Sequence, residues 1–172
     1  MLSQVVQDAI NEQVNNELYS SYLYLAMSAY CERQQFLGSA KWLRMQSEEE
    51  YGHAMRLYDF LTARAGVIHL KAIAEPPTEF PSVPDVFAEA LRHEQGVTAR
   101  IDHLYEMAFT EKAFSALVEL QWFITEQVEE EKTSREIVHK FNLVKADPAS
   151  LLELDRELGQ RSAEPAATAT NG

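Results

Sequence analysis

Cysteine, glycine and proline are scarce in this sequence. Its 172 residues include one cysteine, six glycines and six prolines. The single cysteine, Cys31, excludes a disulfide within the chain, and we expect it to be a small buried residue rather than a redox group. Because glycine and proline weaken helices, their low number and the clustering of the prolines favour long helices.

Basic residues and long apolar runs are also lacking. The chain has 15 lysines and arginines against 27 aspartates and glutamates, a formal net charge of -12. An acidic surface argues against nucleic-acid binding and fits an attraction for cations. No stretch reaches the roughly 20 apolar residues of a membrane span, and the first residues lack the pattern of a secretory signal. We therefore expect a cytoplasmic protein with no membrane or nucleic-acid partner.

What the sequence has is hydrophobic residues at helical spacing. Hydrophobic residues make up 46% of the chain, enough for one domain with a proper core. Apolar residues recur every three or four positions in four long segments, which indicates amphipathic helices. The predicted helices cover approximately residues 3–33, 39–65, 82–110 and 112–141. The first has a second apolar side, which we expect to contact another subunit.

Cap signals and one long connection set the predicted topology. Ser39 is expected to cap the second helix and Gly66 to end it, while Asp147 followed by Pro148 starts a short fifth helix that ends at Gly159. The connection 67–83 can reach about 50 Å when extended, longer than a 27-residue helix of about 40 Å. It can therefore run the length of a bundle, which makes the second and third helices parallel.

The predicted fold is all-α, a four-helix bundle with one long crossover loop and a short fifth C-terminal helix. Residues 1–160 are expected to form this one domain, and the Ala/Thr-rich residues 161–172 a disordered tail. The sequence shows no internal repeat at solenoid spacing.

Glu48-Glu49-Glu50-Tyr51-Gly52-His53 interrupts the apolar pattern of the second helix. Positions i and i+3 share a helix face, so Glu50 and His53 can bind one ion together. A carboxylate beside an imidazole suits iron better than calcium or magnesium. Glu136-x-x-His139 has the same spacing, but it lies about nine residues, roughly 13 Å, further along its helix, so we interpret it as exposed surface.

Positions counted from the helix ends place several polar residues at one level. A rise of about 1.5 Å per residue puts all of them close to mid-bundle. They are Glu17, Glu50, His53, Glu94, Gln127 and Glu130. A carboxylate buried alone is costly, whereas four of them balance two divalent ions. We expect no lysine or arginine at this level that would favour a purely structural pairing. The sequence therefore predicts a dinuclear metal site.

With these residues the sequence resembles a non-haem bacterial ferritin over nearly its whole length. The matching motifs are Asn11-Glu12-Gln13 through Glu17-Leu18-Tyr19-Ser20-Ser21, Glu49-Glu50-x-x-His53, His93-Glu94-Gln95, and Gln121-Trp122-Phe123 through Glu126-Gln127-x-x-Glu130-Glu131-Lys132. Together these motifs are highly specific, although E-x-x-H alone is not.

The resemblance implies a ferroxidase centre in a bundle of the ferritin-like type. Glu17 and His53 would bind one iron, Glu94 and Glu130 a second, and Glu50 would bridge them. The resemblance further implies a nearby third iron site, whose ligands would be Glu49, Glu126, Glu129 and Glu130. For Glu129 a solvated charge run is the alternative. Tyr24 and Gln127 would assist as neighbours of the pair, and Trp122 is either a neighbouring aromatic or a plain core residue.

The resemblance also implies the function and the assembly. The expected activity is oxidation of Fe(II) by oxygen or hydrogen peroxide, with ferric mineral stored inside a hollow homo-oligomer of 24 subunits whose fifth helices line a channel. The haem-binding relatives carry a methionine after the bridging glutamate and a second E-x-x-H; here Tyr51 and Gln127-x-x-Glu130 stand there, which predicts no haem.

Two other functions stay open on the sequence. A di-iron oxidase or oxygenase acting on an organic substrate would need an apolar pocket and usually a second E-x-x-H. A helical interaction module could use a buried polar layer only to fix its register, although four carboxylates at one level disfavour it.

Overall fold

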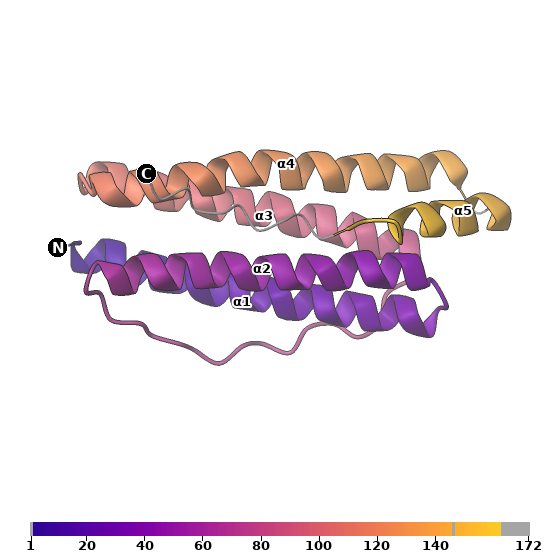
Figure 1. Cartoon of the computed structure of the whole chain (residues 1–172), viewed down its shortest axis with the longest axis horizontal. Coiled ribbons are helices and arrows are strands. Elements are labelled where there is room, and N and C mark those ends of the chain that lie inside the picture. Colours follow the sequence, from indigo (N-terminus) through magenta and orange to yellow (C-terminus); the bar gives the residue numbers. More distant parts are fainter. Residues whose placement is uncertain (1, 146, 163–172) are drawn as a thin grey trace.

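The computed structural model describes residues 2–145 and 147–162, all of them in helices or irregular segments. The helices are α1 (Gln4–Arg33), α2 (Leu37–Ala63), α3 (Val83–Thr110), α4 (Phe114–Val144) and α5 (Pro148–Leu158). The first four lie side by side as a bundle, and α5 lies between α2 and α4 at one end (Figure 1). The predicted all-α bundle with a fifth helix is confirmed. Among these helices none is long and apolar enough to cross a bilayer.

The crossover between α2 and α3 runs along the outside of the bundle, as predicted (Figure 1). It begins where α2 ends and carries the chain back to the end of the bundle where α2 begins, so α2 and α3 are parallel. Two side chains of α1 fix its backbone. Asn11 donates to the Val67 carbonyl and accepts from the His69 amide, and Asn15 bonds in the same way to His69 and Lys71. The crossover therefore lies against protein.

The predicted cap of α5 is confirmed, but the predicted cap of α2 is not. Ser82 and Asp147 accept hydrogen bonds from the first turns of their helices. Ser39 lies inside α2, because the helix already begins at Leu37 and Phe36 precedes it without a side-chain cap. The cap of α2 comes from another helix. The Asp155 carboxylate of α5 accepts hydrogen bonds from the backbone amides of Gly38 and Ser39, at 3.0 and 2.7 Å.

The C-terminal end of α2 also differs in detail from the prediction. The helix ends at Ala63, and the residue in the left-handed region is Ala65, with φ 55°, rather than Gly66. The amides of Ala65 and Gly66 bond back to the carbonyls of Thr62 and Leu61, which is a Schellman ending. Gly66 is needed for space, since a Cβ there would lie 2.3 Å from the Leu61 side chain.

A polar layer divides the core into two apolar clusters. One contains Ile10, Leu57, Leu61, Ile101 and Leu120; the other contains Met27, Cys31, Leu43, Phe87 and Phe141. On each long helix, the polar residues that were predicted to share one level lie between residues of the first cluster and residues of the second. The apolar clusters hold the four helices together on both sides of this layer, so its side chains are fixed in position. Cys31 is buried, as expected, and burial raises the pKa of its thiol to about 12.

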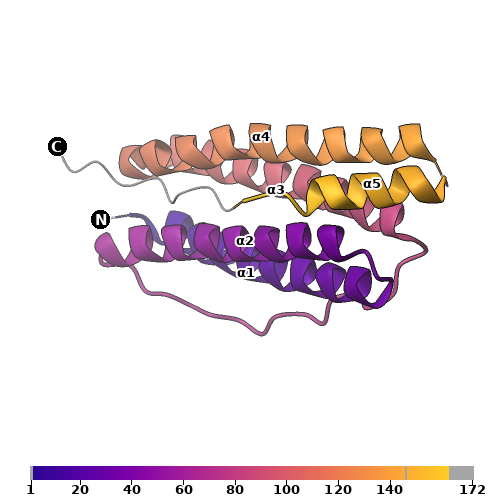
Figure 2. The same cartoon turned by 45° about the vertical axis from the view of Figure 1, so that its right-hand side comes forward.

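Part of the expected C-terminal tail is described. The chain after α5 runs back along the bundle as far as residue 162 (Figure 2). The Arg161 side chain donates hydrogen bonds to Gln46 and Glu49 there. Residues 163–172 of the expected tail lie outside the described residues.

Candidate metal centre

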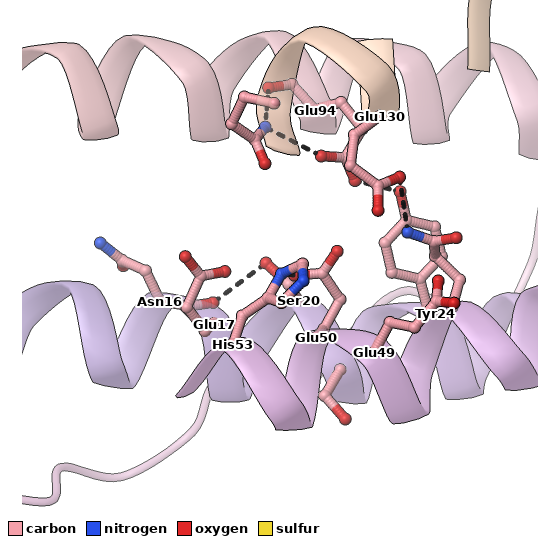
Figure 3. Close-up of polar contacts among 12 residues, drawn as sticks. Asn16, Glu17, Ser20, Tyr24, Glu49, Glu50, His53, Glu94 and Glu130 are labelled. Carbon is pink, nitrogen blue, oxygen red and sulfur yellow. Dashed lines mark hydrogen bonds and ion pairs between the residues drawn. The ribbon is translucent and has the colours of Figure 1, made fainter. Parts of the chain in front are cut away.

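The polar layer contains all six residues that the helical count placed at one level. Each is buried, and none exposes more than 7% of its surface: Glu17, Glu50, His53, Glu94, Gln127 and Glu130. In Figure 3 Glu17, Glu50 and His53 project from α1 and α2 toward Glu94 and Glu130 on α3 and α4. The prediction that these side chains meet inside the bundle therefore agrees with the structure.

Glu17, Glu50 and His53 form a group with the geometry of a cation site. One ligand atom from each lies within 4.8 Å of the others. The Nδ1 atom of His53 is 3.4 Å from Oε2 of Glu50, one helical turn apart on α2. Trp122 and Phe123 of α4 hold the imidazole edge-on, with ring centroids 5.3 and 6.1 Å away. Two carboxylates and one imidazole are ligands suited to iron.

Three carboxylate oxygens in this group have no hydrogen-bond donor among the described residues. They are Oε2 of Glu17 and both oxygens of Glu50. The other oxygen of Glu17 accepts from Gln13 at 2.8 Å. Buried polar atoms are nearly always satisfied, so unsatisfied carboxylate oxygens that face a histidine fit a cation-binding site. Glu50 has both oxygens unpaired at the centre of the group, which suits a ligand between two ions.

Glu94 of α3 accepts hydrogen bonds from side chains of two other helices, α1 and α4. Tyr24 of α1 donates its hydroxyl to Oε1, and the Gln127 amide of α4 donates to Oε2 at 3.2 Å. The same amide also reaches Thr98, at 3.3 Å. Tyr24 and Gln127 are therefore donors that orient a carboxylate, in agreement with their expected place beside the centre.

Glu130 joins a second group that shares His53. His53, Glu126 and Glu130 also offer ligand atoms that lie within 4.8 Å of one another. Gln46 of α2, fully buried, donates to Oε2 of Glu130 at 2.7 Å. The shared histidine places the two groups side by side, as a dinuclear centre requires.

The other two residues expected at a third site lie apart from these groups. Glu49 pairs with Arg161 at 2.6 Å, and its side chain is 31% exposed. Glu129 is on the surface, where it pairs with Lys132 at 3.4 Å. Glu126 alone of the three additional residues converges with Glu130. The second E-x-x-H, Glu136 and His139, is exposed on α4, as expected.

Burial raises the pKa of four carboxyl groups at the centre, and repulsion between carboxylates adds to the shift in three of them. For Glu17 burial raises the pKa well above its usual value, and the charge of Glu50 adds to the effect. Burial and the charges of Glu94 and Glu130 do the same for Glu50, and burial raises the pKa of Glu94. Burial, then the charge of Glu94, raises the pKa of Glu130 to about 7. A bound cation reverses this cost, because it favours the charged form of each ligand.

Sequence reasoning missed several groups around the centre. Gln13 donates to the Glu17 carboxylate and Gln46 to that of Glu130. The only signal of either residue in the sequence was a glutamine at a buried helical position. His93 accepts or donates a 2.8 Å hydrogen bond with Ser20, and burial lowers its pKa to about 4. The expectation of no basic residue near this level is wrong for Arg161, since it approaches from beyond α5.

Comparison with known proteins gives the family. The ferritin family model, described as a ferritin-like domain, matches residues 7–144. A bacterial non-heme ferritin of Bacteroides fragilis is 40% identical over 94% of this chain and all of its own. The chain belongs to the ferritin-like family. A probable bacterial non-heme ferritin-like protein of Haemophilus influenzae is 39% identical, over 94% of this chain and 98% of its own.

Solved ferritin structures agree with this assignment. A ferritin of Archaeoglobus fulgidus engineered to a closed form superimposes with a TM-score of 0.94 at 43% identity, covering 95% of this chain and 100% of that one. A structure of the open pore ferritin from the same archaeon gives a TM-score of 0.93 at 42% identity, covering 94% of this chain and 100% of that one. The predicted ferritin-like fold is thus confirmed, and its polar layer holds a carboxylate and histidine group able to bind metal.

Proposed function

We propose that this protein oxidises Fe(II) at a dinuclear centre in its bundle and stores the ferric product inside a hollow homo-oligomer. The observation that carries the proposal is the unpaired, buried carboxylate oxygens of Glu17 and Glu50 beside His53. The family membership supports iron as the ion. Here iron is the substrate, and no haem takes part.

The proposed ligand roles are those that the resemblance to the ferritins implies. Glu17 and His53 hold one iron, and Glu94 and Glu130 hold the second. Glu50 bridges the pair, because it has two oxygens free and lies next to His53. Tyr24 and Gln127 orient Glu94 as hydrogen-bond donors. Carboxylates favour the higher charge of Fe(III), so the same ligands that bind Fe(II) also promote its oxidation.

The redox balance needs an external oxidant. Two Fe(II) ions lose one electron each. Oxygen takes these two electrons and two protons to give hydrogen peroxide, or hydrogen peroxide takes them to give two waters. The carboxyl groups with raised pKa values release their protons when metal binds, which supplies protons near the oxidant.

A third iron would bind beside the pair, at Glu126 and Glu130 with Glu49 and Glu129. Glu126 and Glu130 already converge. Glu49 must exchange Arg161 for the metal, and Glu129 must exchange Lys132. The third site is therefore proposed as the weaker one.

The assembly is proposed as a cage of 24 subunits with α5 lining a channel, located in the cytoplasm. Exposed apolar side chains on α1 and the crossover support contacts between subunits, among them Tyr22, Leu25, Leu70 and Ile73. An organic substrate is less favoured: a cavity of about 340 Å³ next to Gln127 carries the charged side chains of Asp102, Glu131 and Arg135. A particle mass of several hundred kilodaltons supports storage, whereas a dimer supports the oxidase alternative.

Fe(II) oxidation in variants tests the centre. Glu50→Ala and His53→Ala should each slow the rapid phase of Fe(II) oxidation, followed by absorbance after mixing with oxygen or peroxide. The matched control is Glu136→Ala with His139→Ala, the exposed pair with the same spacing on α4, which should leave the rate unchanged. If Glu50→Ala and His53→Ala both oxidise iron at the parent rate, the ligand assignment is wrong.

A further inference from the structure

Arg161 connects the chain beyond α5 to the candidate metal centre. Its guanidinium donates to Oε2 of Glu49 at 2.6 Å and to Oε1 of Gln46 at 2.9 Å. It also stacks over the Trp42 ring, 4.7 Å from the centroid. Gln46 in turn donates to Glu130 at 2.7 Å, so a continuous chain of hydrogen bonds joins Arg161 to a ligand carboxylate.

The position of Arg161 is fixed by how α5 docks. The Asp155 carboxylate caps the N-terminus of α2, and the backbones of Gly38 and Gly159 meet there. Lys41 of α2 then donates to the Gly159 carbonyl at 2.8 Å. Because α5 runs back along α4, residues 160–162 lead back along the bundle (Figure 2). The docking of α5 on α2 therefore determines where Arg161 makes its contacts.

A guanidinium at Glu49 has two consequences for a third metal. It occupies a carboxylate that the metal needs, and its positive charge repels a cation at Glu126 and Glu130. The pair is only partly buried, with 23% of the Arg161 side chain and 31% of that of Glu49 exposed. Partly exposed pairs of this kind are weak, so a divalent ion can displace the arginine.

We propose that Arg161 is an intramolecular cation that takes the place of the third metal ion at Glu49. This inference rests on the proposed function. While Arg161 is in place, it keeps Gln46 directed at Glu130 and limits the centre to two tightly bound metal ions. A third ion binds only by displacing Arg161. Arg161 therefore sets the affinity of the third site without contacting the first two ions.

Zinc titration of the assembled, metal-free protein tests the proposal. Zn(II) has no redox chemistry, so calorimetry reports binding alone. The parent should bind two Zn(II) per subunit tightly and a third weakly. Arg161→Gln removes the charge and the contact with Glu49, and should tighten the third step at least tenfold and leave the first two within about twofold. Arg161→Lys keeps the charge and should resemble the parent.

Arg156→Gln is the matched control. It removes the same charge from α5, but Arg156 pairs with Glu153 on the surface and does not reach the centre. It should leave all three steps unchanged. A second readout is the fluorescence of Trp42 in a Trp122→Phe background, which should change with the third equivalent of Zn(II) and not with the first two.

The outcomes separate this inference from the proposed function. Two tight ions in both the parent and Arg161→Gln, with equal third steps, overturn the role of Arg161 and leave the dinuclear centre standing. Equal tightening in Arg156→Gln also overturns it, since general charge would then be the cause. A parent that binds no Zn(II) at the buried carboxylates overturns the proposed function and this inference with it.

Discussion

Tyr24 of α1 donates its hydroxyl to Oε1 of Glu94 on α3, across the interior of the bundle. Both side chains are fully buried. Tyr24 also meets the ring of His93 edge-on, at 6.0 Å between centroids. The tyrosine therefore holds a proposed metal ligand from the α1 side while Gln127 holds it from the α4 side, and Glu94 cannot turn away from the centre.

Tyr24→Phe removes this donor with little change of shape. The buried oxygen of Glu94 is then left without its partner, which costs about 1–3 kcal/mol. We expect the unfolding midpoint of the metal-free protein to drop, by roughly 2–4 °C per kcal/mol. Fe(II) oxidation should slow, because Glu94 is no longer held. Thermal unfolding and stopped-flow absorbance measure the two effects, and Tyr51→Phe, at an exposed position of α2, should change neither.

Glu50→Gln should make the metal-free protein more stable. Glu50 has no donor on either oxygen, and it repels the carboxylates of Glu94 and Glu130. A neutral amide of the same shape removes the repulsion and most of the cost of burying a charge. Thermal unfolding with a chelator present should show a higher midpoint than the parent at about pH 8.

The same substitution should abolish most of the stabilisation by Zn(II), because a ligand that binds only the folded state stabilises it in proportion to its affinity. The control is Glu48→Gln, which changes an exposed neighbour on α2. A lower midpoint for metal-free Glu50→Gln than for the parent would show that Glu50 contributes to the fold rather than to metal binding.

The pH dependence of stability should reverse when metal binds. Burial, then the charge of Glu94, raises the pKa of Glu130 from 4.5 to about 7 in the folded protein. Between these values the folded state holds more protons than the unfolded state, so stability falls as pH rises. This contribution is fully present below about pH 4.5 and is lost as pH rises through about 7. Zn(II) binding requires the deprotonated form, so its affinity rises over the same range.

Thermal unfolding at about pH 6 and pH 8, with chelator or with Zn(II), measures both trends. Metal-free protein should have the higher midpoint at pH 6, and the stabilisation by Zn(II) should be larger at pH 8. Glu130→Gln removes the titrating group, so its metal-free midpoint should depend less on pH than that of the parent. A parent that gains stability between pH 6 and pH 8 without metal would contradict the assignment.

The helices and the level of the buried carboxylates could be predicted because they depend on local pattern. Glu17, Glu50 and Glu94 each interrupt an apolar row of regular spacing, and a fixed rise per residue converts position into height. The predicted crossover length then fixed the direction of α3. All six residues of the polar layer were therefore identifiable before any coordinates.

The errors concern contacts between segments far apart in sequence. Ser39 has the chemistry of a cap, but the cap of α2 is Asp155, which lies more than a hundred residues away. Arg161 stands in a segment whose composition indicates disorder, and only the docking of α5 brings it to Glu49. Local pattern contains no information on such contacts, so neither could be predicted.

The docking of α5 can be tested at one glycine. A Cβ at Gly38 would lie 1.8 Å from the Asp155 carbonyl oxygen. That oxygen belongs to the backbone of α5, so it cannot move away without moving the helix. Gly38→Ala should therefore push α5 off α2, with a destabilisation of about 1–3 kcal/mol typical of overpacking. Gly52→Ala is the matched control on the same helix, because a Cβ there meets nothing within 4 Å. That control should gain about 0.5–1 kcal/mol through higher helix propensity.

The Gly38→Ala variant also tests whether the docking of α5 affects the metal centre. If the docking of α5 places Arg161 on Glu49, then Gly38→Ala should also tighten the third Zn(II) step in the direction expected for Arg161→Gln. Hydrogen exchange should show faster exchange in residues 148–158 of Gly38→Ala and unchanged exchange in Gly52→Ala. The double variant Gly38→Ala with Arg161→Gln should bind the third ion no more tightly than Arg161→Gln alone. The reason is that both changes break the same contact, that of the Arg161 guanidinium with the Glu49 carboxylate. Additive tightening would mean that α5 acts on the centre by another route.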